Sequence, residues 1–267
     1  MEESNLLEQI EAAKVYDSLY LPALFGQWAT KVADAANIQS GQRVLDVACG
    51  TGVLSREVAS RVSPSGYIAG LDPSSGMLAV GKELAPEIDW KQGVAESLPF
   101  PEESFDTVVC QFGLMFFSDR HQAIREMLRV LVPGGRMVVA VWDSLTNVPA
   151  YAASVELLER IAGRQAADAL SAPFVLGNRQ TLAALFTDAG ASSVDITTHS
   201  GTARFPSISV MVEADLRGWL PVMGVVLTEE LIGHILHEAE DVLGSYVTSE
   251  GRAVFESPAH VVTSVKE

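Results

Sequence analysis

The chain has 267 residues, of which 48% are hydrophobic and 19% charged; this balance excludes a disordered protein and favours one large packed domain. The formal net charge of -16 repels phosphate backbones and anionic lipids, so we expect no nucleic-acid partner. No apolar run approaches the roughly 20 residues of a membrane span, and the acidic N-terminus lacks the features of a secretory signal. We therefore expect a cytoplasmic protein without a membrane span.

The first half of the chain alternates between short apolar runs and helical stretches. Residues 1–39 are predicted to be helical, with Pro22 separating two helices. The predicted strands that follow are 43–48, 67–71, 88–92, 105–112 and 136–142. The helices expected between them are 53–62, 75–84 and 119–130, and residues 133–135 are expected to form a turn. This alternation indicates a parallel sheet with right-handed crossovers.

The second half is less regular and suggests an inserted unit. We expect helices at 148–164, 179–189, 207–220 and 228–243, and strands at 194–205 and 260–265. The resulting division has an N-terminal helical segment (1–39), an α/β core (40–206 and 250–267) and a helical cap insertion (207–249). Insertions of this length between strands are often lids over a site.

The strongest functional signal is the segment from Val44 to Gly52, in which a buried strand ends in Asp46 and a glycine turn leads into a helix. Gly50 and Gly52 permit a tight turn and the close approach of a ligand. The helix N-terminus attracts a carboxylate, and Asp46 attracts an ammonium. Together they suit an amino acid moiety, although Asp46 taken alone equally suits a cap on the turn.

Three further segments follow neighbouring strands. Asp72 ends the second strand twenty residues after Gly52, where doubly wound folds bind ribose hydroxyls. Residues 93–96 follow the third strand and residues 111–114 follow the fourth. Because ligands in these folds bind beyond the carboxyl ends of the strands, we expect all four segments to converge.

In their order, the motifs VLDVACGTG, GLDPSSGML, QGVAESLPFPEESFD and RVLVPGGRMVVAVW resemble those of class I S-adenosylmethionine-dependent methyltransferases. Within that class, the chain is most similar to the small-molecule group that includes the ubiquinone and menaquinone biosynthesis methyltransferases. The resemblance covers roughly residues 40–145. It implies a doubly wound α/β fold with a mostly parallel seven-stranded sheet of order 3-2-1-4-5-7-6, in which strand seven is antiparallel.

The resemblance also implies S-adenosylmethionine as cofactor and assigns residues to it. The methionine portion falls to Asp46 and the glycine turn, the ribose to Asp72, and the adenine to Met77. Many relatives carry an acid at the position of Val94, so here the adenine amino group must be met by Glu96, by the backbone near Ala95, or by water. The complete predicted cofactor site is Asp46, Ala48, Gly50, Thr51, Gly52, Asp72, Pro73, Met77, Ala95, Glu96 and Gln111.

We expect methyl transfer to an oxygen, nitrogen or carbon nucleophile of a small, hydrophobic or aromatic molecule. An apolar pocket between the cap and the N-terminal helices would bind it, with Tyr20, Phe112, Trp219 and Met223 as candidate substrate residues. No catalytic side chain is identifiable, no metal site is expected, and a homodimer is possible. Tyr16 and Trp28 fit either the cofactor entrance or the core.

Two other functions use the same fold. A NAD(P)-dependent oxidoreductase shares the sheet and the ribose acid, but the turn lacks a third glycine and Asp46 would repel a pyrophosphate. A catalytically silent protein that only binds the cofactor is the third hypothesis, because methyl transfer requires no particular side chain. Ligand binding combined with turnover separates the three.

Overall fold

The computed structural model describes residues 2–267, with side chains from Leu6 onward, so Met1 of the predicted segment 1–39 lies outside the described residues. A seven-stranded sheet has the order β3-β2-β1-β4-β5-β9-β6. Strands β1 to β5 are parallel, and β9 is antiparallel to both of its neighbours. Since β6 and β9 are the sixth and seventh strands of this sheet, the predicted fold class and strand order are confirmed. The strands are β1 (Arg43–Val47), β2 (Tyr67–Asp72), β3 (Asp89–Gln92), β4 (Phe105–Gln111), β5 (Leu131–Trp142), β6 (Asp195–His199) and β9 (Ala259–Val265).

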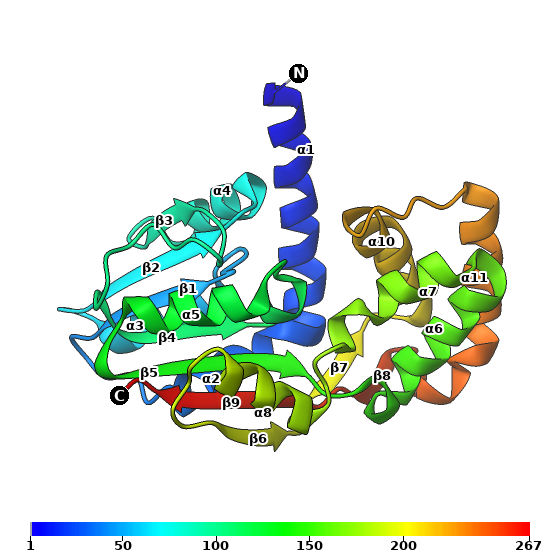
Figure 1. The fold of residues 1–267 in the computed structure, drawn as a ribbon. Helices are drawn as coiled ribbons and strands as arrows, with labels where there is room; N and C mark the ends of the chain where they lie inside the picture. Colours follow the sequence, from blue (N-terminus) through cyan, green and yellow to red (C-terminus); the bar gives the residue numbers. More distant parts are fainter. Residues whose placement is uncertain (1) are drawn as a thin grey trace.

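Helices cover both faces of this sheet (Figure 1). Helices α2 and α3 pack together on one face, and α5 and α8 pack together on the other. The central strands are buried on both faces, as near-continuous apolar strands require. The helices of this part are α2 (Gly26–Ala35), α3 (Val53–Val62), α4 (Ser75–Leu84), the 3-10 turn η2 (Leu114–Phe116), α5 (Arg120–Val130) and α8 (Arg179–Asp188).

The N-terminal segment is helical without the predicted break at Pro22. Helix α1 (Glu2–Val15) runs into a π-helical segment, η1 (Tyr16–Phe25), and then into α2. Pro22 lies inside η1, and the Gly26 N–H donates to the Leu21 carbonyl five residues earlier. The wider π turn accommodates a proline ring that would clash in an α-helix, so the chain continues through Pro22.

Residues 133–135 were expected to form a turn before the fifth strand, but they belong to β5. Phe105 pairs with Leu131 and Thr107 pairs with Arg136, so the three residues form part of a bulge in this strand. Gly134 has a φ of +80°, which glycine adopts without strain. Gly134 therefore has the backbone conformation of a turn residue, but the segment forms an irregularity within β5 instead of a turn before it.

The predicted strand 194–205 is two strands. The chain leaves the large sheet after β6, and β7 (Thr202–Phe205) pairs with β8 (Ala253–Glu256), a strand that the sequence analysis missed. Gly201 lies at the switch, where a Cβ would come within 2.4 Å of the Trp28 ring. Close packing on the N-terminal helix therefore divides a run that looks continuous in the sequence.

A helical lobe stands beside the α/β part, with α1 between them (Figure 1). In this lobe, α11 packs on α6 and α9, and α6 packs on α7. The lobe thus includes α6 and α7, which precede the predicted insertion 207–249. Gly163, with a φ of +87°, ends α6 within the predicted helix 148–164. The remaining helices and helical turns beyond β5 are η3 (Leu145–Asn147), α6 (Pro149–Ala162), α7 (Arg164–Ser171), η4 (Ala172–Phe174), α9 (Ile208–Ala214), η5 (Asp215–Trp219), α10 (Leu220–Val222), α11 (Glu229–Val242) and η6 (Gly244–Tyr246).

Among residues 2–267, none of the helices combines the length and the apolar character that a bilayer span requires.

Candidate cofactor and substrate site

Asp46 is the penultimate residue of β1, and only 1% of its surface is exposed. The Ser55 hydroxyl donates to Asp46 Oδ2 at 2.6 Å, whereas Oδ1 is buried without a hydrogen-bond partner among the described residues. Burial raises the pKa of Asp46 to about 7, against the opposing effect of the Ser55 hydrogen bond, and Asp72 raises it further. A buried oxygen without a donor is a position where a ligand donor is expected.

The two glycines of the turn have different surroundings. Both adopt positive φ, +56° at Gly50 and +86° at Gly52. A Cβ on Gly52 would lie 2.2 Å from the Trp90 ring, but a Cβ on Gly50 would meet nothing within 4 Å. Gly52 therefore serves internal packing, while Gly50 leaves open space where a ligand can approach the backbone.

Asp72 holds the glycine turn from the end of β2. Its Oδ2 accepts from the Gly50 N–H and its Oδ1 from the Ser74 N–H, both at 2.9 Å. Burial raises the pKa of Asp72 against these two hydrogen bonds. A carboxylate has about four acceptor positions, so both oxygens retain capacity for a diol. Nearby, Pro73 is exposed and Met77 is half-buried at the start of α4.

Two residues without glycine's freedom adopt the left-handed region at neighbouring strand ends. Ala48 follows β1 with a φ of +58°, and Phe112 follows β4 with a φ of +57°. A Cβ on Gly113 would lie 2.5 Å from the Ala48 Cβ, so the two turns pack directly together. Such strain costs about 1–2 kcal/mol per residue and concentrates at functional sites.

The residues predicted near adenine are tied to other parts of the chain. Glu96 Oε1 accepts from the N–H groups of Ser118 and Asp119, at 2.8 and 3.2 Å. Ala95 is buried and Val94 is exposed. Gln111 donates to the Phe25 carbonyl at 3.3 Å, but its Oε1 is buried without a partner among the described residues.

The N-terminal helices close over the glycine turn through residues that the sequence analysis did not single out. Thr51 Oγ1 donates to Asp17 Oδ1 at 2.7 Å, and Ser75 Oγ donates to Gln9 Oε1 at 2.9 Å. Tyr16 lies close enough to Asp72 and Asp17 for both acids to raise its pKa, although burial is the larger cause.

An aromatic cluster connects these helices to the strand ends; its members are Tyr16, Tyr20, Phe25, Phe112 and Trp142. The Phe112 and Trp142 rings stack with centroids 3.8 Å apart, so one face of Phe112 is covered. Phe25 contacts both of these rings as well as Tyr16 and Tyr20. The predicted residues Tyr20 and Phe112 therefore belong to one connected group.

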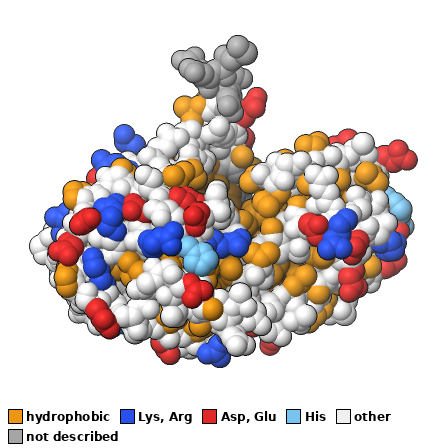
Figure 2. Space-filling model, viewed as in Figure 1, with side chains coloured by type: hydrophobic (Ala, Val, Ile, Leu, Met, Phe, Trp, Pro, Cys, Tyr) orange, Lys and Arg blue, Asp and Glu red, His pale blue; other side chains and the backbone are white. Residues whose placement is uncertain are grey.

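The helical lobe reaches this cluster through the predicted insertion. Tyr20 donates its phenol hydrogen to Asp215 Oδ1 at 3.0 Å, and Trp219 packs on Phe116 with ring centroids 5.1 Å apart. The Trp219 indole N–H donates to the Ala169 carbonyl, and Met223 is half-buried. Figure 2 shows a hollow between the α/β part and the lobe, where hydrophobic side chains gather.

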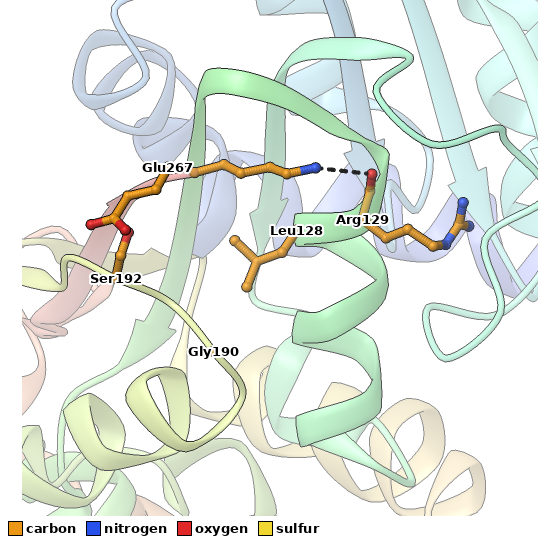
Figure 3. A pocket seen from close by; sticks show the side chains of 6 residues that line it. Leu128, Arg129, Gly190, Ser192 and Glu267 are labelled. Atoms are coloured by element: carbon orange, nitrogen blue, oxygen red, sulfur yellow. Dashed lines mark hydrogen bonds between the residues drawn. The ribbon is translucent and has the colours of Figure 1, made fainter.

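A second hollow lies away from these residues. It has a volume of about 310 Å³ (Figure 3). It lies where β5 begins and β9 ends, at the ends of the strands opposite to those that carry Asp46 and Asp72. Lys266 Nζ reaches across it to the carbonyls of Leu131 and Arg129, at 2.7 and 3.4 Å. The ammonium group is thus already used in holding the C-terminus to the end of α5. The lining residues are Leu128, Arg129, Gly190, Ser192, Lys266 and Glu267.

A family profile described as the ubiE/COQ5 methyltransferase family matches residues 15–206, well over half of the chain. The chain belongs to this family. The ubiE/COQ5 match covers the site residues from Tyr16 to Phe112 and ends directly before the predicted insertion. It confirms the family prediction made from the four motifs, and it does not favour the NAD(P)-dependent alternative.

The chain spans only about half to three quarters of the length of the curated relatives it matches, which carry related names. The chain is 36% identical over 156 residues to the "Ubiquinone/menaquinone biosynthesis C-methyltransferase UbiE" of Hahella chejuensis, covering 52% of this chain and 63% of that relative. It is 34% identical over 184 residues to the protein of the same name from Cronobacter sakazakii, covering 63% and 73%. The crystal structure of the YcgJ protein from Bacillus subtilis matches with a TM-score of 0.59 at 20% identity, covering 90% of this chain and 98% of that one.

Within the part of the chain that the structure describes, no group of three or more histidine, cysteine, aspartate or glutamate side chains is placed to hold a metal ion. Cys49 and Cys110 are free and buried. The chemistry available at this site therefore rests on the strand-end acids, the glycine turn and the aromatic cluster.

Proposed function

We propose that this protein transfers a methyl group from S-adenosylmethionine to a small hydroxylated aromatic molecule. The observation that carries the proposal is the orphaned Asp46 Oδ1 beside the open face of Gly50, in a chain of the ubiE/COQ5 methyltransferase family. The names of its relatives, C-methyltransferases of quinone biosynthesis, favour carbon as the nucleophile and a hydroquinone-like acceptor.

The residues at the strand ends fit the charges and hydrogen-bonding groups of this cofactor. Asp46 Oδ1 would accept from the ammonium of the methionine portion, whose carboxylate would lie near the N-terminus of α3. Asp72 would accept from both ribose hydroxyls. Met77 would pack on adenine, and Ala95, Glu96 and Gln111 complete the proposed set together with Ala48, Thr51, Gly52 and Pro73.

The sulfonium of the bound cofactor supplies a methyl carbon that already carries a good leaving group. The protein then mainly has to align the acceptor and keep water away. The N-terminal helices serve the second task, because Asp17 and Gln9 hold them over the glycine turn and α4. The stacked pair of Phe112 and Trp142 gives the strand ends an apolar floor.

The substrate would occupy the apolar hollow between the α/β part and the lobe. Tyr20 and Phe112 would bound it on one side, and Trp219 and Met223 on the other. The proposal keeps the predicted division of the chain, in which residues 207–249 form a cap over this hollow. A homodimer and a cytoplasmic location also stay predictions, and the first is measurable by light scattering.

The test combines binding and turnover. Calorimetry should detect binding of S-adenosylmethionine and of S-adenosylhomocysteine. When phenols, hydroquinones and naphthols are tested as methyl acceptors, some of them should cause the enzyme to release adenosylhomocysteine. Tight binding of NAD in place of both would favour an oxidoreductase. Cofactor binding with no turnover across a panel extended to amines and thiols would favour a silent binding protein.

A further inference from the structure

Asp215 is a carboxyl group buried in the apolar helical lobe, with 5% of its surface exposed. Its Oδ1 accepts from the Tyr20 hydroxyl, and no hydrogen bond among the described residues uses its Oδ2. An acceptor oxygen that is left free on an otherwise buried carboxyl group is a position that a ligand donor can use. Hydrophobic neighbours on both sides of it, Met211 and Trp219, are four residues away on the same helical stretch.

Both members of the pair lie in π-helical segments. Tyr20 belongs to η1 of the N-terminal helices, and Asp215 begins η5 of the lobe. π turns place an extra residue in a helix and occur frequently at functional sites. Here the two segments meet directly through the Tyr20–Asp215 hydrogen bond, which joins the N-terminal helices to the lobe. The pair is thus set by the meeting of two parts of the chain that are 195 residues apart.

The pair is connected to the proposed methyl-transfer site through the aromatic cluster. The Tyr20 ring lies 6.0 Å from Tyr16, whose hydroxyl feels the charge of Asp72, and 6.3 Å from Phe25. On the lobe side, Trp219 contacts Phe116 just beyond the end of β4. A molecule that fills the hollow would therefore meet the strand ends on one side and Asp215 on the other.

We propose that Asp215 is the catalytic base of this enzyme and that Tyr20 is its positioning residue. This proposal rests on the proposed methyl transfer and adds the hydroxyl recognition that the cofactor residues do not supply. Asp215 Oδ2 accepts a hydrogen bond from a substrate hydroxyl conjugated with an aromatic ring. The substrate class is accordingly a phenol or hydroquinone with an apolar body.

Carbon methylation would begin at the substrate hydroxyl. The hydroxyl proton moves to Asp215 Oδ2, and the electron pair left on oxygen increases the electron density at the ortho and para carbons. One of these carbons bonds to the methyl carbon while the methyl–sulfur bond breaks and sulfur keeps its electron pair. The ring carbon then loses its proton to water, and Asp215 returns its proton to the oxygen. The net change is substitution of one ring hydrogen by methyl, with release of a proton.

The electrostatic surroundings suit a base. Burial raises the pKa of Asp215 to about 7, while the Tyr20 hydrogen bond lowers it. Tyr151 of α6 also faces it, and the pKa of Tyr151 is raised by burial and, to a smaller extent, by Asp215. Arg217 of the same segment points to Glu213 and Glu229 and is exposed. A carboxyl group titrating near neutral pH is matched to proton transfer there.

The test begins with binding, which does not depend on turnover. The wild-type protein saturated with S-adenosylhomocysteine should bind 1-naphthol at least tenfold more tightly than 1-methoxynaphthalene, and Asp215→Asn should reduce this preference to less than threefold. A wild-type protein that binds both equally, or neither, overturns the proposal. Adenosylhomocysteine binding should be unchanged in Asp215→Asn, which also verifies that the variant is folded.

Turnover provides the second readout, using an acceptor from the phenol panel. Asp215→Asn should lower kcat/KM by at least 100-fold. Tyr20→Phe removes a hydrogen bond that lowers the Asp215 pKa, so the ascending limb of the kcat/KM–pH profile should move to higher pH. A structural pair would leave the position of that limb unchanged, and an unmoved limb in Tyr20→Phe overturns the proposal.

A matched control lies at the edge of the sheet, where Tyr67 donates to Asp89 Oδ2 at 2.6 Å. Tyr67→Phe and Asp89→Asn make the same chemical changes far from the hollow and should leave the naphthol preference and the pH profile as in the wild type. Failure of the proposed function looks different: the naphthol preference would depend on Asp215 while no acceptor releases adenosylhomocysteine.

Discussion

The α/β part and the helical lobe each bury one carboxyl group whose pKa is raised to about 7, but they hold it in different ways. Asp46 has a local partner, Ser55, nine residues along the chain. Asp215 has a distant one, Tyr20, which belongs to the N-terminal helices. The first is built by a single strand–turn–helix unit, and the second exists only when the lobe and the N-terminal helices meet. Changes in the two regions should therefore separate cofactor binding from substrate handling.

The largest effect is expected at Gly52 in the α/β part. Gly52→Ala adds a Cβ 2.2 Å from Trp90 at a φ of +86°, and both the overlap and the backbone strain destabilise the fold. We expect a loss of about 2–4 kcal/mol in the free energy of unfolding, measured by urea titration. Gly50→Ala is the matched control, with positive φ but open space, and should lose about 1–2 kcal/mol. Equal losses in the two variants would contradict the packing role of Gly52.

In the lobe, Met223→Lys should abolish turnover while cofactor affinity persists. Met223 is half-buried against the core of the lobe beside the proposed substrate hollow, where a charge would be desolvated. Val222 is its neighbour and is 76% exposed, so Val222→Lys adds the same charge in water and should act like the wild type. Calorimetry with adenosylmethionine and an adenosylhomocysteine release assay check both variants. Wild-type turnover in Met223→Lys would remove this residue from the substrate site.

Asp72→Ala, in contrast to Met223→Lys, should weaken cofactor binding. The substitution removes the proposed acceptors for two ribose hydroxyls, and it also leaves the Gly50 and Ser74 N–H groups without their acceptor. Charge-assisted hydrogen bonds contribute about 1.5–3 kcal/mol each, so affinity should fall at least tenfold. Unchanged affinity in calorimetry, with an intact thermal transition, would refute the ribose assignment.

Asp46→Asn should have the smallest effect, a change in how the thermal stability of the ligand-free protein depends on pH. A folded-state pKa of about 7, above the ordinary 3.8, means that stability present at low pH is lost as pH rises through about 7. Asparagine does not titrate, so the midpoint temperature of the variant should gain on the wild type by several degrees between pH 5 and pH 8. Scanning calorimetry of the ligand-free proteins measures this difference. A constant difference across that range would mean that Asp46 is already ionised in the folded protein.

Much of the α/β part was predictable because its information is local. The strand and helix pattern of residues 43–142 follows from hydrophobic periodicity, and the spacing of the glycines predicts the tight turn after β1. The positions of Asp46 and Asp72 at strand ends follow from the same pattern, and parallel pairing brings strand ends together. The ligand roles of these residues stay predictions.

The errors arose where a distant part of the chain overrode a local signal. The helix continues through Pro22 as a π-helical segment, and Gly201 lies between β6 and β7, where Trp28 leaves no room for a Cβ. Residues 133–135 have turn chemistry, but pairing with β4 makes them a bulge. In each case the local preference was correct and the tertiary contact decided its consequence.

The family, the fold class and the strand-end residues were predictable from the sequence, because they follow from local motifs and from the order of these motifs along the chain. The folded arrangement was needed to show that Asp17 and Gln9 close the N-terminal helices over the turn, and that Tyr20 meets Asp215. An acid at position 215 interrupts an apolar helical stripe, which marks it as unusual but does not name its partner. That partner depends on how two helical parts pack, and packing is a property of surfaces that lie far apart in the sequence.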